Sequence, residues 1–251
     1  MKGNTKETLL FWLAILSGIS SIASFVIALC SDQSKSIIAL IAIIIFLITL
    51  LISFWYAVCK MVNKEFDKEY LKLSFFTKYE CIDQTHIIYD GYRLIQSKRP
   101  FLSDIKWAFK WSGTKQPTIS STLQNCDGKI IANTSNDYDH VVLKFKKALF
   151  YNESVVVHFH ADMDDVDGTA QPHLDVKIEE PISVVDFRVI LAYKDNNFSE
   201  MAKFMRKPIS SNVPTDYHTL ENVAFNPHSK SYEYILTNPE VGYFYRLEWI
   251  K

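Results

Sequence analysis

The sequence predicts a membrane protein of the α+β class, with an N-terminal two-helix transmembrane hairpin followed by a mostly antiparallel β-sandwich or barrel domain. Two long stretches without charged residues lie close together near the N-terminus. From about residue 74 onward, apolar residues recur at every second position, which is typical of strands with one buried face. Turn-forming pairs such as Ser112-Gly113 and Asp127-Gly128 separate several of these stretches.

The two uncharged stretches are residues 9–30 and 37–59, of 22 and 23 residues. A helix needs roughly 20 apolar residues to cross the hydrocarbon core of a bilayer. Only the six residues 31–36 separate the stretches, so we expect two spans joined as a tight hairpin. The first stretch is longer than the apolar part of a signal peptide and is followed at once by another span, which favours a signal anchor.

The lysines that flank the spans predict the orientation of the hairpin. Basic residues precede the first span and follow the second, whereas the connecting loop carries one lysine beside an aspartate. Both termini should therefore be cytoplasmic. The net charge of −1 gives no overall attraction to nucleic acid or anionic lipid. Two of the four cysteines lie at span ends, so a disulfide framework is not expected.

After the second span, residues 60–73 show helical spacing and no glycine or proline, which predicts a helical stalk. Residues 74–251 are expected to form one β-rich sensor domain. We expect one helix inside it, over residues 199–207, because Ser199 is a good N-cap at its start and Pro208 follows its end. The expected strands, about eight in number, are residues 85–96, 104–111, 128–134, 140–146, 154–161, 186–194, 231–237 and 243–250.

Four serines in the first span, Ser17, Ser20, Ser21 and Ser24, follow the spacing i, i+3, i+4, i+7 and would share one face of a helix. Small residues allow transmembrane helices to approach closely. We therefore expect this face to form the packing seam of the hairpin or of an oligomer, or else to line a partly hydrated path between several copies. The span carries no charged residue that would indicate a transporter site.

Residues 93–115 contain six basic residues and one acidic residue, with Trp107 and Trp111 between them. Such a segment can hold the phosphates of a ligand by charge. The predicted phosphate contacts are Arg93, Arg99, Lys106 and Lys110. The alternative is a solvated strand face opposite a tryptophan-rich core face, since the lysines and tryptophans alternate along one strand.

A second candidate site is the segment 158–168, in which His158 and His160 share one face of a predicted strand and four aspartates follow. Two histidines and a carboxylate can bind a divalent transition metal. The alternative, which we favour, is a solvated strand that leads into an acidic turn, with no metal. Because the sequence contains none of the common catalytic motifs, neither an enzyme nor a cofactor is expected.

Two spans, a short outer loop, a cytosolic stalk and a β-rich domain together resemble the two-transmembrane, β-strand-rich effectors of bacterial anti-phage defence. These include CBASS effectors and related effectors of nucleotide-signalling or retron systems. The resemblance lies in architecture alone. It implies that the β domain binds a cyclic nucleotide or oligonucleotide made by a partner enzyme, and that homo-oligomers permeabilise the bacterial inner membrane. The alternatives are a passive membrane-anchored module that tethers a soluble partner, or a membrane-bound enzyme that uses His158 and His160.

Overall fold

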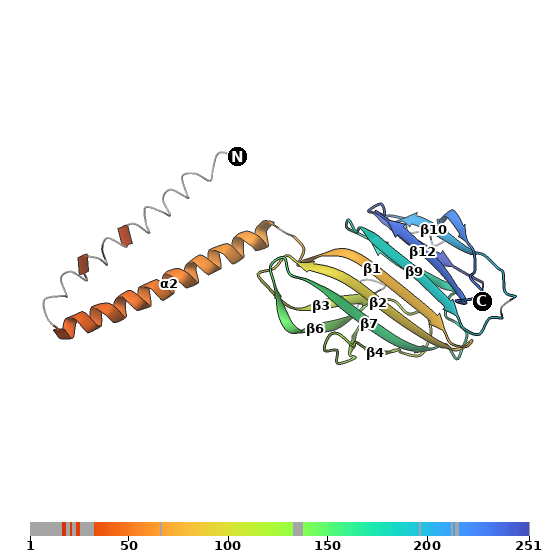
Figure 1. Cartoon of the computed structure of the whole chain (residues 1–251), viewed down its shortest axis with the longest axis horizontal. Helices are drawn as coiled ribbons and strands as arrows, with labels where there is room; N and C mark the ends of the chain where they lie inside the picture. The colour runs from red at the N-terminus through yellow and green to blue at the C-terminus, as the bar shows by residue number, and fades with distance from the viewer. Residues whose placement is uncertain are drawn as a thin grey trace. The chain divides into compact units, whose positions relative to one another are not determined.

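The computed structural model describes residues 17–18, 21, 24–25, 33–65, 67–132, 138–195, 197–211, 213 and 216–250. The chain divides into two compact units, Met1–Lys64 and Glu65–Lys251. The described part of the first unit consists mainly of helix α2 (Gln33–Glu65), and the second unit is a β domain (Figure 1).

Between Ile37 and Cys59, helix α2 carries no charged residue on any of its faces. Its segment Leu40–Val62 spans 23 residues with a mean hydropathy of 2.7, and none of it is buried in the protein. At about 1.5 Å per residue, this segment is long enough for the hydrocarbon core of a bilayer. Thr49 donates a hydrogen bond to the carbonyl of Ile45 at 2.8 Å, which satisfies its hydroxyl inside the helix. By length and composition, α2 is therefore able to cross a membrane.

The prediction of a two-helix hairpin is wrong. In the part of the chain that the structure describes, α2 alone is long and apolar enough to span a membrane. Of the predicted first span, only residues 17–18, 21 and 24–25 are described, as helical, and Ser20 lies outside the described residues. Ser21 donates its hydroxyl proton to the carbonyl of Ser17 at 3.0 Å. Ser17, Ser21 and Ser24 are thus described, but nothing tests their predicted role in a seam.

The predicted helical stalk over residues 60–73 also needs correction. Helix α2 ends at Glu65, and strand β1 begins at Tyr70. Tyr70–Leu73 therefore belongs to the β domain, where it pairs with the end of the second strand. A short run of residues with good helix propensity does not remain helical when it can join a sheet and bury one face.

The β domain is built from three sheets (Figure 1). Six strands, in the order β12-β9-β1-β2-β7-β4, form the largest sheet, four form β11-β10-β13-β8, and three form β3-β6-β5. The only parallel pair among these described strands is β1 with β9. The strands are β1 (Tyr70–Cys81), β2 (His86–Ser97), β3 (Phe101–Phe109), β4 (Thr118–Ser120), β5 (Ile130–Ile131), β6 (Asp139–Phe150), β7 (Ser154–Asp164), β8 (His173–Ile178), β9 (Val184–Leu191), β10 (Ala202–Pro208), β11 (His218–Val223), β12 (Ser231–Thr237) and β13 (Tyr243–Glu248).

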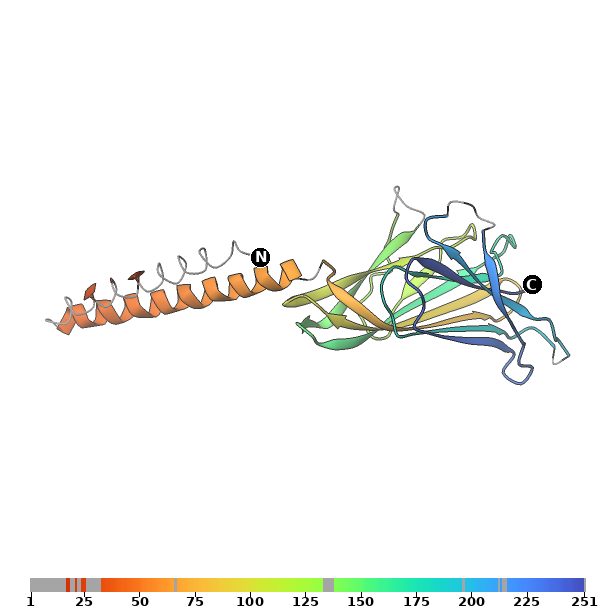
Figure 2. The same ribbon diagram turned by 90° about the horizontal axis from the view of Figure 1, so that it is seen from above.

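The large sheet forms one layer, and the two smaller sheets share the opposite layer (Figure 2). Strand β7 shows how the sequence produces this arrangement. Its alternate residues Val157, Phe159, Ala161 and Met163 are buried, whereas His160 and Asp162 point to the other face. The prediction of a mostly antiparallel β domain therefore agrees with the sheets that are observed.

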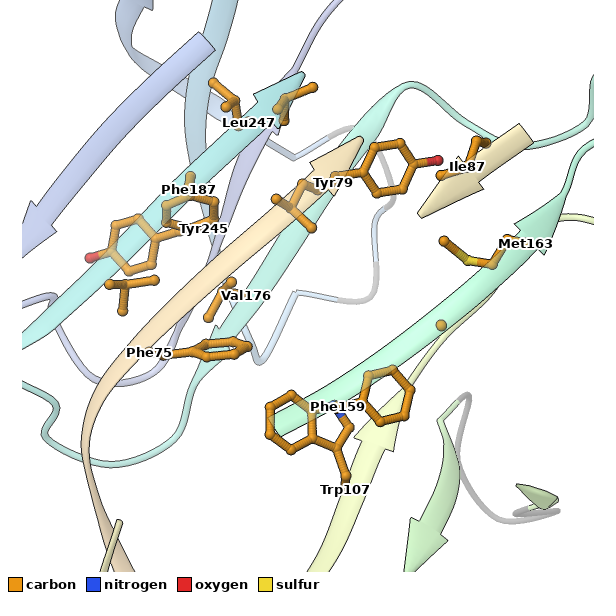
Figure 3. Close-up of a cluster of buried hydrophobic side chains, with 14 of the residues drawn as sticks. Phe75, Tyr79, Ile87, Trp107, Phe159, Met163, Val176, Phe187, Tyr245 and Leu247 are labelled. Atoms are coloured by element: carbon orange, nitrogen blue, oxygen red, sulfur yellow. The ribbon is translucent and has the colours of Figure 1, made fainter. Parts of the chain in front are cut away.

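Aromatic rings join the layers in two places, and Figure 3 shows the first of them, between Trp107 and Phe159. Trp107 of β3 stacks on Phe159 of β7, with ring centroids 5.2 Å apart, and Phe204 of β10 packs edge-on against Phe187 of β9. The first contact requires Gly91 on β2, because a Cβ atom there would lie 2.6 Å from Trp107. Each of the smaller sheets is thus fixed to the large sheet by its own aromatic contact.

The predicted helix over residues 199–207 is wrong, because Ala202–Pro208 forms strand β10 between β11 and β13. Ala202 and Phe204 are fully buried on its inner face, and this burial outweighs the helix propensity of the segment. The eight predicted strands correspond to β2, β3, β5, β6, β7, β9, β12 and β13. The sequence reasoning did not identify β1, β4, β8, β10 and β11 as strands.

Candidate functional site

The basic residues that the sequence predicts as phosphate contacts do not converge. Arg93 lies on the inner face of β2, where its guanidinium is 3.6 Å from the ring centroid of Trp107 and 4.5 Å from that of Phe75. Burial lowers the pKa of Arg93 below its usual value. Arg93 is therefore a half-buried residue whose guanidinium packs on aromatic rings of the core.

The other three residues lie apart from Arg93. Arg99 donates a weak hydrogen bond of 3.5 Å to the carbonyl of Asp67, beside the start of β1. Lys106 and Lys110 are exposed, and Lys106 points away from the core because its neighbour Trp107 points inward. This placement matches the alternative interpretation of the segment, a solvated strand face opposite a buried aromatic face.

The histidines on β7 form a compact polar cluster with Asp90 of β2. Register places Asp90 directly opposite His160. The Oδ1 atom of Asp90 is 2.7 Å from Nδ1 of His160 and 3.3 Å from Nε2 of His158. Its Oδ2 atom is 3.0 Å from the ammonium of Lys78. Burial raises the pKa of Asp90, but hydrogen bonds from His160, Lys78 and His158 outweigh burial and hold this pKa below its ordinary value.

The same three residues have the composition of a metal site with two histidines and one carboxylate, and their ligand atoms lie within 4.8 Å of one another. The hydrogen bonds oppose this interpretation. The backbone N–H of Thr122 donates to Nδ1 of His158 at 3.1 Å, so the ring proton lies on Nε2, the atom that would bind the metal. Lys78 also places a positive charge on the carboxylate. The cluster is best described as a hydrogen-bonded network around Asp90.

We expect the substitution Asp90→Asn to lower the free energy of unfolding by about 1–3 kcal/mol, because Lys78 and both histidines lose a charged acceptor. Chemical denaturation of the full chain in detergent measures this loss. The matched control is Asp162→Asn, which breaks the exposed pair between Asp162 and His86 and should cost under about 1 kcal/mol. Stoichiometric zinc in the unmodified protein, lost in Asp90→Asn, would instead establish a metal centre.

A pocket of about 390 Å³ lies at the C-terminal end of β1. Its walls include three aromatic side chains, and the rings of Tyr79 and Trp249 are 5.2 Å apart. Tyr193 and Lys194, which follow β9, also line the pocket, together with the buried thiol of Cys81 and the polar side chains of Asp83 and Gln84. The volume falls within the usual range of small-molecule sites, and apolar walls with few polar groups are typical of such sites.

The polar groups of this pocket define what it can bind. Burial raises the pKa of Tyr79, so its hydroxyl remains protonated and able to donate. The ammonium of Lys194 lies 4.3 Å from the ring centroid of Phe198, which positions a cation at the pocket wall. Another hollow, of about 540 Å³, is lined by surface turns around Gln116 and Asp127 and has no aromatic wall. We therefore take the pocket beside Tyr79 as the candidate site.

No protein-family model matches the sequence, and no curated protein matches it. Among solved structures, the chain is similar to an M1 zinc metallopeptidase from Deinococcus radiodurans, with 8% identity, a TM-score of 0.34 and coverage of 72% of this chain and 42% of that one. A putative protease from Parabacteroides distasonis matches at 6% identity and a TM-score of 0.42, over 72% of this chain and 40% of that one. The chain thus spans about two fifths of these proteins, and the likeness assigns neither a family nor an activity.

The residues of the pocket come from four distant parts of the sequence, and local patterns did not identify them. Asp90 was missed for the same reason, since only the pairing of β2 with β7 brings it to the histidines. The prediction that His158 and His160 share one face of a strand is confirmed.

Proposed function

We propose that this chain is a membrane-anchored ligand-binding protein, in which α2 holds the β domain at a bilayer. The single observation that carries the proposal is the 23-residue apolar segment of α2, none of which is buried against the protein. In water, an exposed apolar surface of this size is strongly unfavourable, and a bilayer removes the cost. The β domain, with its own core, supplies the binding function.

The ligand that the pocket fits best is a small planar anion of the nucleotide type. Tyr193 is the more accessible ring for stacking a base, whereas the rings of Tyr79 and Trp249 are over nine-tenths buried in the wall. Lys194 offers a charge for a phosphate. This proposal keeps the expected ligand class but moves the binding site. The residues Arg93, Arg99, Lys106 and Lys110 are spread over the inner and outer faces of the domain, and the pocket replaces them.

The lysines that follow the apolar segment support an orientation with the β domain in the cytosol, at a bacterial inner membrane. They are Lys64, Lys68 and Lys72, and Lys60 lies in the last turn of the segment itself. We further propose that ligand binding leads homo-oligomers of the chain to permeabilise this membrane. Dye entry into cells that express the chain measures that step, and a passive tether for a soluble partner would show none.

The pocket is tested by titration calorimetry on the full chain in detergent, with AMP, cyclic di-AMP and inorganic phosphate as probes. We expect a nucleotide to bind, and the substitution Lys194→Met to weaken its binding by about tenfold or more. Lys106→Met is the matched control, since it removes an exposed lysine of the sequence-predicted site. Binding that is lost in Lys106→Met but kept in Lys194→Met would contradict the pocket, as would the absence of nucleotide binding.

A further inference from the structure

Three chain segments meet at the end of the β domain where β1 begins (Figure 1). The backbone N–H of Ser97, at the end of β2, donates to the carbonyl of Glu153, which precedes β7. The N–H of Lys98 donates to the carbonyl of Glu69, the residue before β1. These bonds, of 2.9 and 2.8 Å, join the β2–β3 turn to the β6–β7 turn and to the residue before β1.

Exposed aromatic side chains gather on these turns. Phe101, Phe150 and Tyr151 are 63%, 46% and 39% exposed, and we call them the aromatic tip. The register of β3 and β6 pairs Phe101 with Phe150, and their ring centroids are 6.3 Å apart. Large aromatic residues are usually buried, so an exposed group of them marks a surface that contacts another apolar phase or partner.

The sequence places the aromatic tip on the side of the domain that is tethered to α2. Only residues 66–69 separate the end of α2 from the start of β1. A fully extended chain of this length reaches at most about 18 Å. If α2 spans a bilayer, the aromatic tip lies within reach of the membrane–water interface, where aromatic side chains are favoured.

The charges around the aromatic tip allow this contact. Lys146 and Lys147, on β6 shortly before Phe150, are exposed and can reach lipid phosphates while their carbon chains lie along apolar surface. Among the nearby acids, Glu153 accepts a hydrogen bond of 2.8 Å from the N–H of Phe150. Asp67 and Glu69, in the segment 66–69 that joins α2 to β1, are also exposed and offset the charge of the lysines. The apolar rings, and not net charge, therefore supply most of the affinity for lipid.

We propose that the aromatic tip inserts into the lipid interface and fixes the β domain on the membrane surface. This inference rests on the proposed anchoring by α2. Because the pocket lies at the other end of β1, a strand of twelve residues, the insertion directs the pocket away from the bilayer and toward ligand in solution.

Photo-crosslinking tests the proposal on the full chain in nanodiscs of phosphatidylcholine and phosphatidylglycerol. Benzoylphenylalanine is placed at position 150 and, as the matched control, at position 166. Val166 is 73% exposed but follows the opposite end of β7. We expect lipid adducts, detected by mass spectrometry, at position 150 and not at position 166.

Three results would overturn the inference: no lipid adduct at position 150, equal adducts at both positions, or a crosslink from position 150 to a second copy of the chain. Co-purification of the chain with the nanodiscs separates this failure from that of the anchor. A chain that stays with the nanodisc but forms no adduct at position 150 contradicts the aromatic tip alone. A chain that does not associate with the nanodisc contradicts both proposals.

Discussion

Replacing Trp107 with alanine is expected to lower the free energy of unfolding by about 3–5 kcal/mol. The side chain is 1% exposed and stacks on Phe159 at an interplanar angle of 3°. It also packs edge-on against Phe75 and carries the guanidinium of Arg93 on its ring. The substitution leaves a cavity between two sheets and removes the aromatic partner of a buried cation. Denaturant unfolding of the full chain in detergent, followed by circular dichroism, measures the loss.

The matched control is Trp111→Ala, four residues farther along the chain. Trp111 is half-buried and donates from its indole N–H to the carbonyl of Lys115, so we expect a loss of only about 1 kcal/mol. The contact with Gly91 provides a second check. Gly91→Ala should destabilise the native chain, because its Cβ atom would clash with the ring of Trp107. The same substitution should have a smaller effect in a chain that already carries Trp107→Ala, because that ring is then absent. Equal losses in Trp107→Ala and Trp111→Ala would contradict this account of the core.

Most of the strands that sequence reasoning found alternate between more buried and more exposed residues over much of their length. Strand β9 is the clearest example, with every second residue buried from Val185 to Leu191. Strand β10 shows the limit of this reasoning. Its bulge between Phe204 and Met205 places two neighbouring residues in the core, and this interruption of the two-residue period resembles helical spacing.

The alternation along β2 also indicates on which face Arg93 lies, which a count of basic residues does not show. Gly91, Arg93 and Ile95 lie on one face of β2, and the first and last of them are buried. A basic residue in phase with core positions is expected to point inward. By contrast, no local pattern could indicate Asp90 or Lys194 as site residues, because strand register and the closure of distant loops bring them to their partners.

Glu180, in the connection between β8 and β9, links this connection to the segment that precedes β1. Its carboxylate is 2.8 Å from the ammonium of Lys68 and 3.0 Å from that of Lys72, and its side chain is only 8% exposed. Burial raises the pKa of Glu180, but the hydrogen bond and charge of Lys68 and Lys72 outweigh it and hold the pKa below its usual value. Burial and the nearby Arg93 lower the pKa of Lys72.

Glu180→Gln is therefore expected to lower the free energy of unfolding by about 3 kcal/mol at neutral pH, because Lys72 and Arg93 remain without the charge that offsets theirs. The matched control is Glu240→Gln. Glu240 forms an exposed ion pair of 2.8 Å with Arg206, and its loss should cost under about 1 kcal/mol. Denaturant unfolding of both variants in the full chain provides the comparison.

The pH dependence distinguishes charge from packing at Glu180. Since folding lowers the pKa of this carboxyl, its contribution to stability is complete above the ordinary glutamate pKa of about 4.3 and is lost as the pH falls through the folded value. The stability difference between the native chain and Glu180→Gln should therefore shrink as the pH falls below about 4, and it should vanish below the folded pKa, where both side chains are neutral. A difference that stays constant from pH 7 to pH 3 would show that the carboxylate charge does not stabilise this cluster, and that the amide disturbs its packing instead.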